Sequence, residues 1–314
     1  MDNVESALKM AESMIYKRVK NNIKHLLPAS FHPCCQSAAR KGRFWFRYMY
    51  HALDHRTLSQ EEFIGELKRL GITRGATIYL HSSMDELIRR VAGQSAFKFI
   101  NLLKELVGEE GTLLAPTFPF LGLQYDYVQR QRVFNVEHTS SMVGLFTELF
   151  RRTEGVTRSL HPTHPIAAWG KHSKELVEEH HLGTAFGEKS PVWKMQRYNG
   201  LVVGIGVSPR NCFTLYHVAE ELHPITHAMH YSNDTFEMTI ICGNEKIPYR
   251  VTPLRPDRVR KFGRADRILR SEHILRYYTV KGLRLSVAPA SKFLQRAHEL
   301  IDANLFYSKG YRKI

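Results

Sequence analysis

The stretch Leu201-Val-Val-Gly-Ile-Gly-Val207, followed by Thr214-Leu-Tyr-His-Val-Ala-Glu220, decides the fold class of this chain. The first segment is a short apolar run of the kind found in buried strands, and the second has apolar residues at helical spacing. Similar strand-like runs occur earlier, at residues 77–81, 112–115 and 166–169. Helical patterns lie between these runs. Strands that alternate with helices predict a layered α/β fold.

The rest of the chain carries further helix and turn signals. Ser59 and Glu62 have the spacing of a capping box, which marks the start of a helix. Residues 235–251 hold a Gly-Asn turn between two strand-like runs, which predicts a hairpin on the sheet edge. From these patterns we expect helices over residues 59–71, 95–107, 139–150, 214–222 and 291–304.

Length and composition are those of a globular protein. The chain has 314 residues, 43% of them hydrophobic and 24% charged, so a substantial core forms without metal or disulfide staples. It holds no run of about 18 apolar residues and no secretory signal in its first 25 residues. Its four cysteines form no CxxC pair, which favours reduced thiols. We expect a soluble, cytoplasmic protein without a transmembrane segment.

The net charge is unusual. Forty-five Lys and Arg residues against thirty Asp and Glu residues give +15, a balance that concentrates anions near the surface. Residues 255–284 hold ten Lys or Arg residues together with Tyr277 and Tyr278. This segment makes a basic nucleic-acid-binding protein the rival reading, but no RNA or DNA motif accompanies it. We expect no nucleic-acid partner.

Residues 1–56 differ from the remainder. Residues 1–26 have apolar positions three or four apart and a basic opposite face, which predicts an amphipathic helix. Such a helix packs on its own domain or on a partner subunit, or it makes peripheral contact with a membrane surface. We therefore divide the chain into a helical N-terminal extension and connector, residues 1–56, and an α/β domain, residues 57–314. A monomer and a homodimer both remain open.

Four short polar clusters fall where strands or helices begin or end, which is where α/β proteins keep their sites. They are His81-Ser-Ser83, Pro116-Thr-Phe118, Arg158-Ser-Leu-His-Pro162 and Thr214-Leu-Tyr-His-Val-Ala-Glu220. Each cluster alone has an ordinary explanation, such as a helix cap or a rigid turn. His217 and Glu220 share a helix face and form at least a local pair.

The order and spacing of these clusters are more specific than any single one. Together with residues 140–152 and 187–191, they resemble the aminoglycoside 3-N-acetyltransferase family over about residues 59–225. The resemblance implies a layered α/β/α core with a mixed central sheet. It also implies a coenzyme A-dependent N-acyltransferase, with acetyl-CoA or another acyl-CoA as co-substrate.

The resemblance places the catalytic histidine at His217, with Glu220 one turn further on. A protonated amine is not a nucleophile, so a base must remove its proton as it attacks the thioester, and histidine suits that task near neutral pH. Glu220 would fix the tautomer of the ring. Thr214, one turn earlier, is a candidate donor for the developing oxyanion.

The resemblance also points to coenzyme-contacting residues. Small hydroxyl side chains, exposed backbone N–H groups and an arginine suit phosphate and pantetheine contacts. These residues are His81, Ser82, Ser83, Thr117, Arg158, Ser159 and His161. One position departs from the family pattern, because Pro165 stands where the family usually has a serine, so a hydroxyl expected near the coenzyme is lost.

Two other chemistries fit the sequence less well. His217, His223, His227 and His230 crowd fourteen residues, but no cysteine accompanies them and Pro224 interrupts the helix, so we expect no metal. Cys212 lies five residues before His217, and nothing near it indicates an activated thiol.

The acceptor is the least determined part. Because the chain is strongly basic, an anionic acceptor such as a nucleotide-linked amino sugar of surface-polysaccharide synthesis is our first hypothesis. An aminoglycoside antibiotic is the alternative, with Glu137, Glu220 and Asp85 as acidic candidates for the lining of its cleft.

Overall fold

The computed structural model describes residues 56–227, 230–257 and 261–308, which apart from Arg56 lie within the unit Thr57–Ile314. The predicted helix over residues 1–26 and most of the connector up to residue 56 lie outside the described residues, so the division at residue 56 stays a prediction. Within the described ranges, no helix has the length and apolar character needed to cross a bilayer.

A seven-stranded mixed sheet forms the centre of this unit, in the order β4-β5-β2-β1-β6-β10-β9. Strands β2, β1 and β6 are parallel, and antiparallel strands flank them on both sides. The strands are β1 (Thr77–Ser82), β2 (Thr112–Pro116), β4 (Thr157–Arg158), β5 (Ile166–Gly170), β6 (Leu201–Ile205), β9 (Arg276–Val280) and β10 (Leu283–Pro289).

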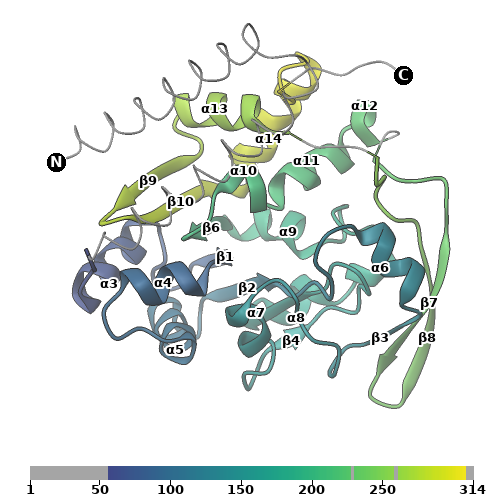
Figure 1. Ribbon diagram of the computed structural model, residues 1–314, viewed down its shortest axis with the longest axis horizontal. Helices are drawn as coiled ribbons and strands as arrows, with labels where there is room; N and C mark the ends of the chain where they lie inside the picture. The colour runs from purple at the N-terminus through teal and green to yellow at the C-terminus, as the bar shows by residue number, and fades with distance from the viewer. Residues whose placement is uncertain (1–55, 228–229, 258–260, 309–314) are drawn as a thin grey trace, which may run out of the picture. The chain divides into compact units, whose positions relative to one another are not determined.

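Side chains alternate between the two faces of the sheet along each strand, so a hydrophobic layer forms on either face. On β6, Val202 packs into one hydrophobic cluster, whereas Val203 and Ile205 pack into the other. Figure 1 shows helices gathered along both sides of the sheet, so the predicted α/β/α layering is confirmed. One cluster includes α3 (Gln60–Arg69), α4 (Met84–Arg90), α5 (Ala96–Val107) and α7 (Leu145–Phe150). The other includes α8 (Ser173–Val177), α9 (Pro191–Lys194), α11 (Leu215–Leu222), α13 (Gly263–Ser271) and α14 (Ala290–Asp302).

The predicted hairpin forms, but its place was wrong. Strands β7 (Phe236–Cys242) and β8 (Glu245–Val251) join β3 (Val133–Asn135) in a separate three-stranded sheet, which stands apart from the central strands in Figure 1. Side chains of this sheet and Val128 from α6 (Gln124–Arg130) form a third hydrophobic cluster. The hairpin therefore has a core of its own and does not need the edge of the central sheet.

The starts of the helices show which local sequence signals predicted the structure correctly. The capping box of Ser59 and Glu62 forms at the start of α3 as predicted. The helix expected from Thr139 or Ser140 begins only at Leu145, because Gly144, with φ 137°, precedes it and Ser141 bonds sideways to the Thr147 hydroxyl. The short elements α10 (Pro209–Cys212), α12 (Pro224–His227), η2 (His180–Leu182) and η3 (Met195–Tyr198) complete the described helices.

Candidate active site

His217 lies on α11, which follows β6 and the short helix α10 along the chain. Its Nδ1 lies 3.0 Å from Oε2 of Glu220, one turn further along the same helix. The Glu220 side chain is fully buried, and its second oxygen accepts a hydrogen bond from the Tyr307 hydroxyl. A carboxylate held in this way accepts the Nδ1 proton, which leaves Nε2 with the lone pair that a general base needs.

Two aromatic rings hold the imidazole in place. Phe186 stacks on His217 with ring centroids 5.3 Å apart, and Phe262 meets it edge-on at 5.5 Å. The His217 side chain nevertheless keeps 31% of its surface exposed. The ring is therefore fixed by apolar walls and remains open on one side, as a base that meets a substrate must be.

Thr214 and His81 come together at the start of α11. The Thr214 hydroxyl lies 3.3 Å from the Tyr79 hydroxyl and 3.5 Å from Nε2 of His81, which stands near the end of β1. Burial lowers the pKa of His81 to about 3, so its ring is neutral at any ordinary pH. Two residues predicted for different roles, one catalytic and one coenzyme-binding, thus share one buried contact.

Ser82 and Ser83 differ in what their hydroxyls do. The Ser83 side chain caps α4 by accepting the N–H of Glu86, and its own N–H donates to the Ile205 carbonyl. The Ser82 hydroxyl is buried and has no hydrogen-bond partner among the described residues. Of the pair, Ser82 keeps a hydroxyl for a ligand, whereas Ser83 acts as a helix cap.

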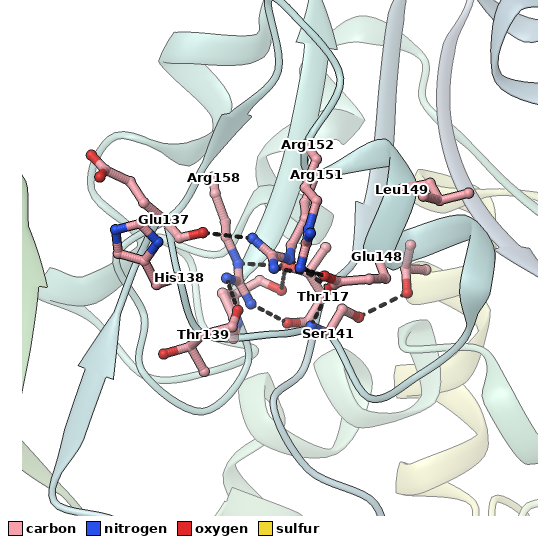
Figure 2. A network of polar contacts seen from close by, with 12 residues as sticks. Thr117, Glu137, His138, Thr139, Ser141, Glu148, Leu149, Arg151, Arg152 and Arg158 are labelled. Atoms are coloured by element: carbon pink, nitrogen blue, oxygen red, sulfur yellow. Dashed lines mark hydrogen bonds and ion pairs between the residues drawn. The ribbon is translucent and has the colours of Figure 1, made fainter. Parts of the chain in front are cut away.

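Arg158 is buried, and its side chain links several backbone segments (Figure 2). Its guanidinium donates to the Thr117 hydroxyl and carbonyl and to the carbonyls of Val136 and Thr139, at 2.6 to 3.0 Å. These bonds use four of its five N–H groups. Burial lowers its pKa to about 9, and the ring of Phe134 lies 5.0 Å from the guanidinium carbon. This geometry argues against the phosphate contact that we predicted for Arg158.

A second arginine extends the same network. Arg151 forms a bidentate pair with Glu148, in which both N–O distances are 2.7 Å. An N–H of its remaining terminal nitrogen donates to the Glu137 carbonyl. The Glu148 carboxylate also accepts the N–H of Ser141 and pairs with Arg152 (Figure 2). Together the two arginines tie residues 136–141 to β4 and α7.

Three other predicted coenzyme residues shape a buried turn. Thr117 donates both its N–H and its hydroxyl to the Pro165 carbonyl, and Ser159 bonds to Nδ1 of His180 and to the N–H of Ile166. His161 accepts the N–H of His164 on its own Nδ1. All three residues are buried, and the hydroxyls of Thr117 and Ser159 and Nδ1 of His161 bond within the protein. Pro165, which departs from the family pattern, contributes its backbone carbonyl to this turn.

A pocket of about 350 Å³ opens beside the small sheet. It carries two carboxylates and one guanidinium: the Tyr125 hydroxyl donates to Asp234 at 2.6 Å, and Arg255 pairs with Asp257 at 2.8 Å. Its residues are Tyr125, Tyr231, Ser232, Asn233, Asp234, Arg255, Pro256 and Asp257. No motif surrounds these acidic residues, and the sequence pointed instead to Glu137, Glu220 and Asp85.

The four closely spaced histidines contact different groups, except that His217 and His230 both approach Glu220. His223 bonds to Asp302, His227 bonds to the Glu221 carbonyl, and His230 lies against the two glutamates beside His217. In the described part of the chain, no group of three or more His, Cys, Asp or Glu residues is arranged to hold a metal ion. The Cys212 thiol donates to the Ser208 carbonyl, and burial raises its pKa to about 12, which makes it a poor nucleophile.

Comparison with known proteins reveals relatives of one kind. The sequence profile described as aminoglycoside 3-N-acetyltransferase matches residues 79–302. The SPbeta prophage-derived aminoglycoside N(3')-acetyltransferase-like protein YokD of Bacillus subtilis (strain 168) is 30% identical over 178 residues, which are 52% of this chain and 64% of that protein. Aminoglycoside N(3)-acetyltransferase III of Serratia marcescens is 28% identical over 193 residues, 58% of this chain and 70% of the relative.

Solved structures agree on the fold. The crystal structure of aminoglycoside acetyltransferase AAC(3)-Xa superposes with a TM-score of 0.66 at 22% identity, covering 79% of this chain and 94% of that one. The structure of AAC-IIIb as a binary complex with CoASH gives a TM-score of 0.64 at 18% identity, with 79% and 98% covered. With the profile spanning most of the chain, this protein belongs to the aminoglycoside 3-N-acetyltransferase family, a family of acetyl-CoA-dependent N-acetyltransferases.

Proposed function

We propose that the protein transfers an acetyl group from acetyl-CoA to an amine of an amino sugar, with His217 as the general base. One observation carries the proposal: the His217 ring is partly exposed, and its Nδ1 is held by the buried Glu220. In the reaction, Nε2 of His217 accepts a proton from the amine as the nitrogen bonds to the thioester carbonyl carbon. The carbon–sulfur bond then breaks, and the departing thiolate takes up a proton.

Glu220 and Tyr307 stabilise the imidazolium that forms in this step. The carboxylate lies against Nδ1 of His217, and the Tyr307 hydroxyl satisfies its other oxygen. Since all of Glu220 is buried, its charge acts on the ring without screening by water. Removing the Tyr307 hydroxyl would therefore weaken the charge pair without breaking it.

The acceptor that we propose is a cationic amino sugar of the aminoglycoside type. The two relatives described above are named for aminoglycosides. Among the described residues that line the pocket beside the small sheet are Asp234 and Asp257, together with the guanidinium of Arg255. Local charge of this sign attracts ammonium groups even though the whole chain carries +15. The nucleotide-linked acceptor, which rested on the total charge, finds no support in this pocket.

Fewer residues support the proposed coenzyme site than the sequence predicted. Ser82 supports it, because its buried hydroxyl has no partner among the described residues and stands at the end of β1 beside His81. The carboxyl ends of parallel strands are where open α/β sheets bind their ligands. We propose Ser82 and the neighbouring backbone as coenzyme contacts. Arg158 would act indirectly, by holding the adjoining turn in place.

The nucleic-acid reading loses its main argument. The basic segment 255–284 contains α13, β9 and the start of β10, and several of its cations are paired. Arg270 pairs with Asp266, Lys281 with Glu62, and Arg255 with Asp257. Side chains already paired with carboxylates contribute little to phosphate binding.

A thiol-release assay tests the proposal. The full chain is incubated with acetyl-CoA and, in separate reactions, with gentamicin-like aminoglycosides or with nucleotide-linked amino sugars. We expect free coenzyme A thiol with the aminoglycosides, and none from His217→Ala. Turnover confined to nucleotide amino sugars would reject the acceptor but keep the chemistry, whereas normal turnover by folded His217→Ala would reject the chemistry.

A further inference from the structure

A second buried carboxylate stands directly after Glu220. The Glu221 side chain is 1% exposed, and it accepts three hydrogen bonds. Oε2 accepts the N–H of Phe186 at 3.1 Å and the Tyr231 hydroxyl at 2.5 Å, and Oε1 accepts the Thr184 hydroxyl. Two of these donors lie on one short loop, so Glu221 joins α11 to that loop.

The loop carries the ring that holds the proposed base. Phe186 stacks on His217 with an interplanar angle of 26°, and its other neighbours include His164 at 4.8 Å and His230 at 6.3 Å. The bond to Glu221 comes from the backbone N–H of Phe186 itself. A change at Glu221 therefore moves the backbone from which the stacking ring projects.

Other hydrogen bonds hold the loop at its backbone carbonyls. His180 Nε2 lies 3.0 Å from the Ala185 carbonyl, and the Tyr249 hydroxyl donates to the Gly183 carbonyl at 3.3 Å. A Cβ atom at Gly187 would lie 3.1 Å from Oε1 of Glu221, so the chain passes close to this carboxylate. Glu221 is the described side chain that accepts the backbone N–H of Phe186.

We propose that Glu221 is a positioning residue for the reaction: it fixes the loop 184–187 and thereby holds the Phe186 ring against His217. The inference rests on the proposed function, because it gives Glu221 its role through the base. Misplacement of a catalytic group by about 1 Å can cost about 100-fold in rate. Loss of Glu221 is thus expected to lower kcat more than the KM for acetyl-CoA.

The test compares kcat and KM for wild type, Glu221→Ala, Glu221→Gln, Phe186→Leu and the double variant Glu221→Ala/Phe186→Leu. We expect Glu221→Ala to lower kcat by roughly 10- to 100-fold with the acetyl-CoA KM within about twofold. Glu221→Gln keeps a carbonyl oxygen for the Phe186 N–H, so it should recover most of that loss. The kcat of the double variant should lie within about twofold of the kcat of the slower single variant, because both changes act through one ring.

Controls separate positioning from loss of fold. Asp302→Asn removes another carboxylate near the end of α11, one that bonds to His223 and not to the loop, and should leave kcat unchanged. Circular dichroism and thermal melting report the fold of each variant. If Glu221→Ala does not fold, Thr184→Val replaces it in the double-mutant comparison with Phe186→Leu. This substitution removes the loop hydroxyl that donates to the Glu221 carboxylate.

The outcomes distinguish the two claims. A folded Glu221→Ala with normal kcat, or losses that multiply fully in the double variant, would overturn the positioning role. Substitution of His217 by alanine is measured alongside. If that variant is inactive while Glu221→Ala is normal, only the positioning role falls, whereas an active His217→Ala removes the base on which both claims depend.

Discussion

At the scale of single residues, His217 and Glu220 were predictable and Tyr307 was not. The first two lie three positions apart on one helix, a spacing that puts them on the same face whatever the fold. Tyr307 reaches Glu220 across 87 positions of sequence. Phe186 and Glu221 likewise meet only through the folded loop. Contacts of this range leave no periodic signal, so they become visible only in the structure.

Tyr307→Phe tests the long-range member of this group. The substitution removes one hydroxyl from Glu220 and leaves the ring packed, so the imidazolium loses part of its support. We expect kcat to fall by about tenfold, the cost of one hydrogen bond to a charged group. Steady-state kinetics at saturating acetyl-CoA measure the effect. Tyr198→Phe, which removes a similar bond to Glu175 at the surface, should have no effect; equal losses in both variants would contradict the role of Tyr307.

At the scale of elements, the polar cluster Arg158-Ser-Leu-His-Pro162 was assigned to the coenzyme, and the structure shows several of its side chains bonded within the protein. β4 is only two residues long, and the loops around it leave carbonyls turned inward. Arg158 satisfies them, and such carbonyls cannot be inferred from sequence. The strands and the capped helix α3 were predictable because alternation and capping are local.

Arg158→Lys tests the structural assignment. Lysine keeps the charge but cannot reach all the acceptors of the guanidinium, so buried carbonyls lose their donors. We expect the free energy of unfolding to fall by about 3 kcal/mol in urea titrations. Arg152→Lys, at an exposed pair in the same network, should cost less than about 0.5 kcal/mol. Unchanged stability of Arg158→Lys with a salt-dependent loss of acetyl-CoA affinity would restore the phosphate role.

At the scale of the whole molecule, total charge and local charge point to different acceptors. The value of +15 is spread over cations that are often paired, whereas the pocket near the small sheet carries Asp234 and Asp257. Fold class followed from the alternation of strands and helices. The pocket did not, because α6, the segment before β7 and the segment after β8 bring its residues together from separate parts of the chain.

Asp234→Asn tests the pocket as the acceptor site. Removing this carboxylate should raise the KM for an aminoglycoside about tenfold and leave the KM for acetyl-CoA unchanged, since the charge attracts only the cationic substrate. The effect should shrink as salt is added. Glu109→Gln, at an exposed position outside the pocket, is the matched control. An unchanged acceptor KM in Asp234→Asn would place the acceptor elsewhere.

Buried histidines should make the protein sensitive to acid. Burial lowers the pKa of His180 from 6.5 to about 4 and that of His81 to about 3, and it acts in the same direction on His161 and His164. Between pH 6.5 and 4 the unfolded chain binds protons that the folded protein does not. The free energy of unfolding therefore falls as pH drops through this window, by about 3 kcal/mol for a group such as His180.

Glu221 acts in the opposite direction. Burial raises its pKa from 4.5 to about 7, so its contribution to stability is present at low pH and is lost as pH rises towards 7. Glu221→Gln removes this compensation, and its stability should fall more steeply below pH 6.5 than that of wild type. Urea titrations from pH 5 to 7.5 measure both slopes. A flat profile in wild type would contradict the buried, neutral state of the histidines.

The base assignment is tested most directly by single-turnover kinetics of His217→Ala, paired with a measurement of acetyl-CoA affinity. We predict a loss of about 10²- to 10⁴-fold in the rate of acetyl transfer, with the coenzyme bound as tightly as in wild type. A folded His217→Ala protein that transfers acetyl at the wild-type rate would contradict the account.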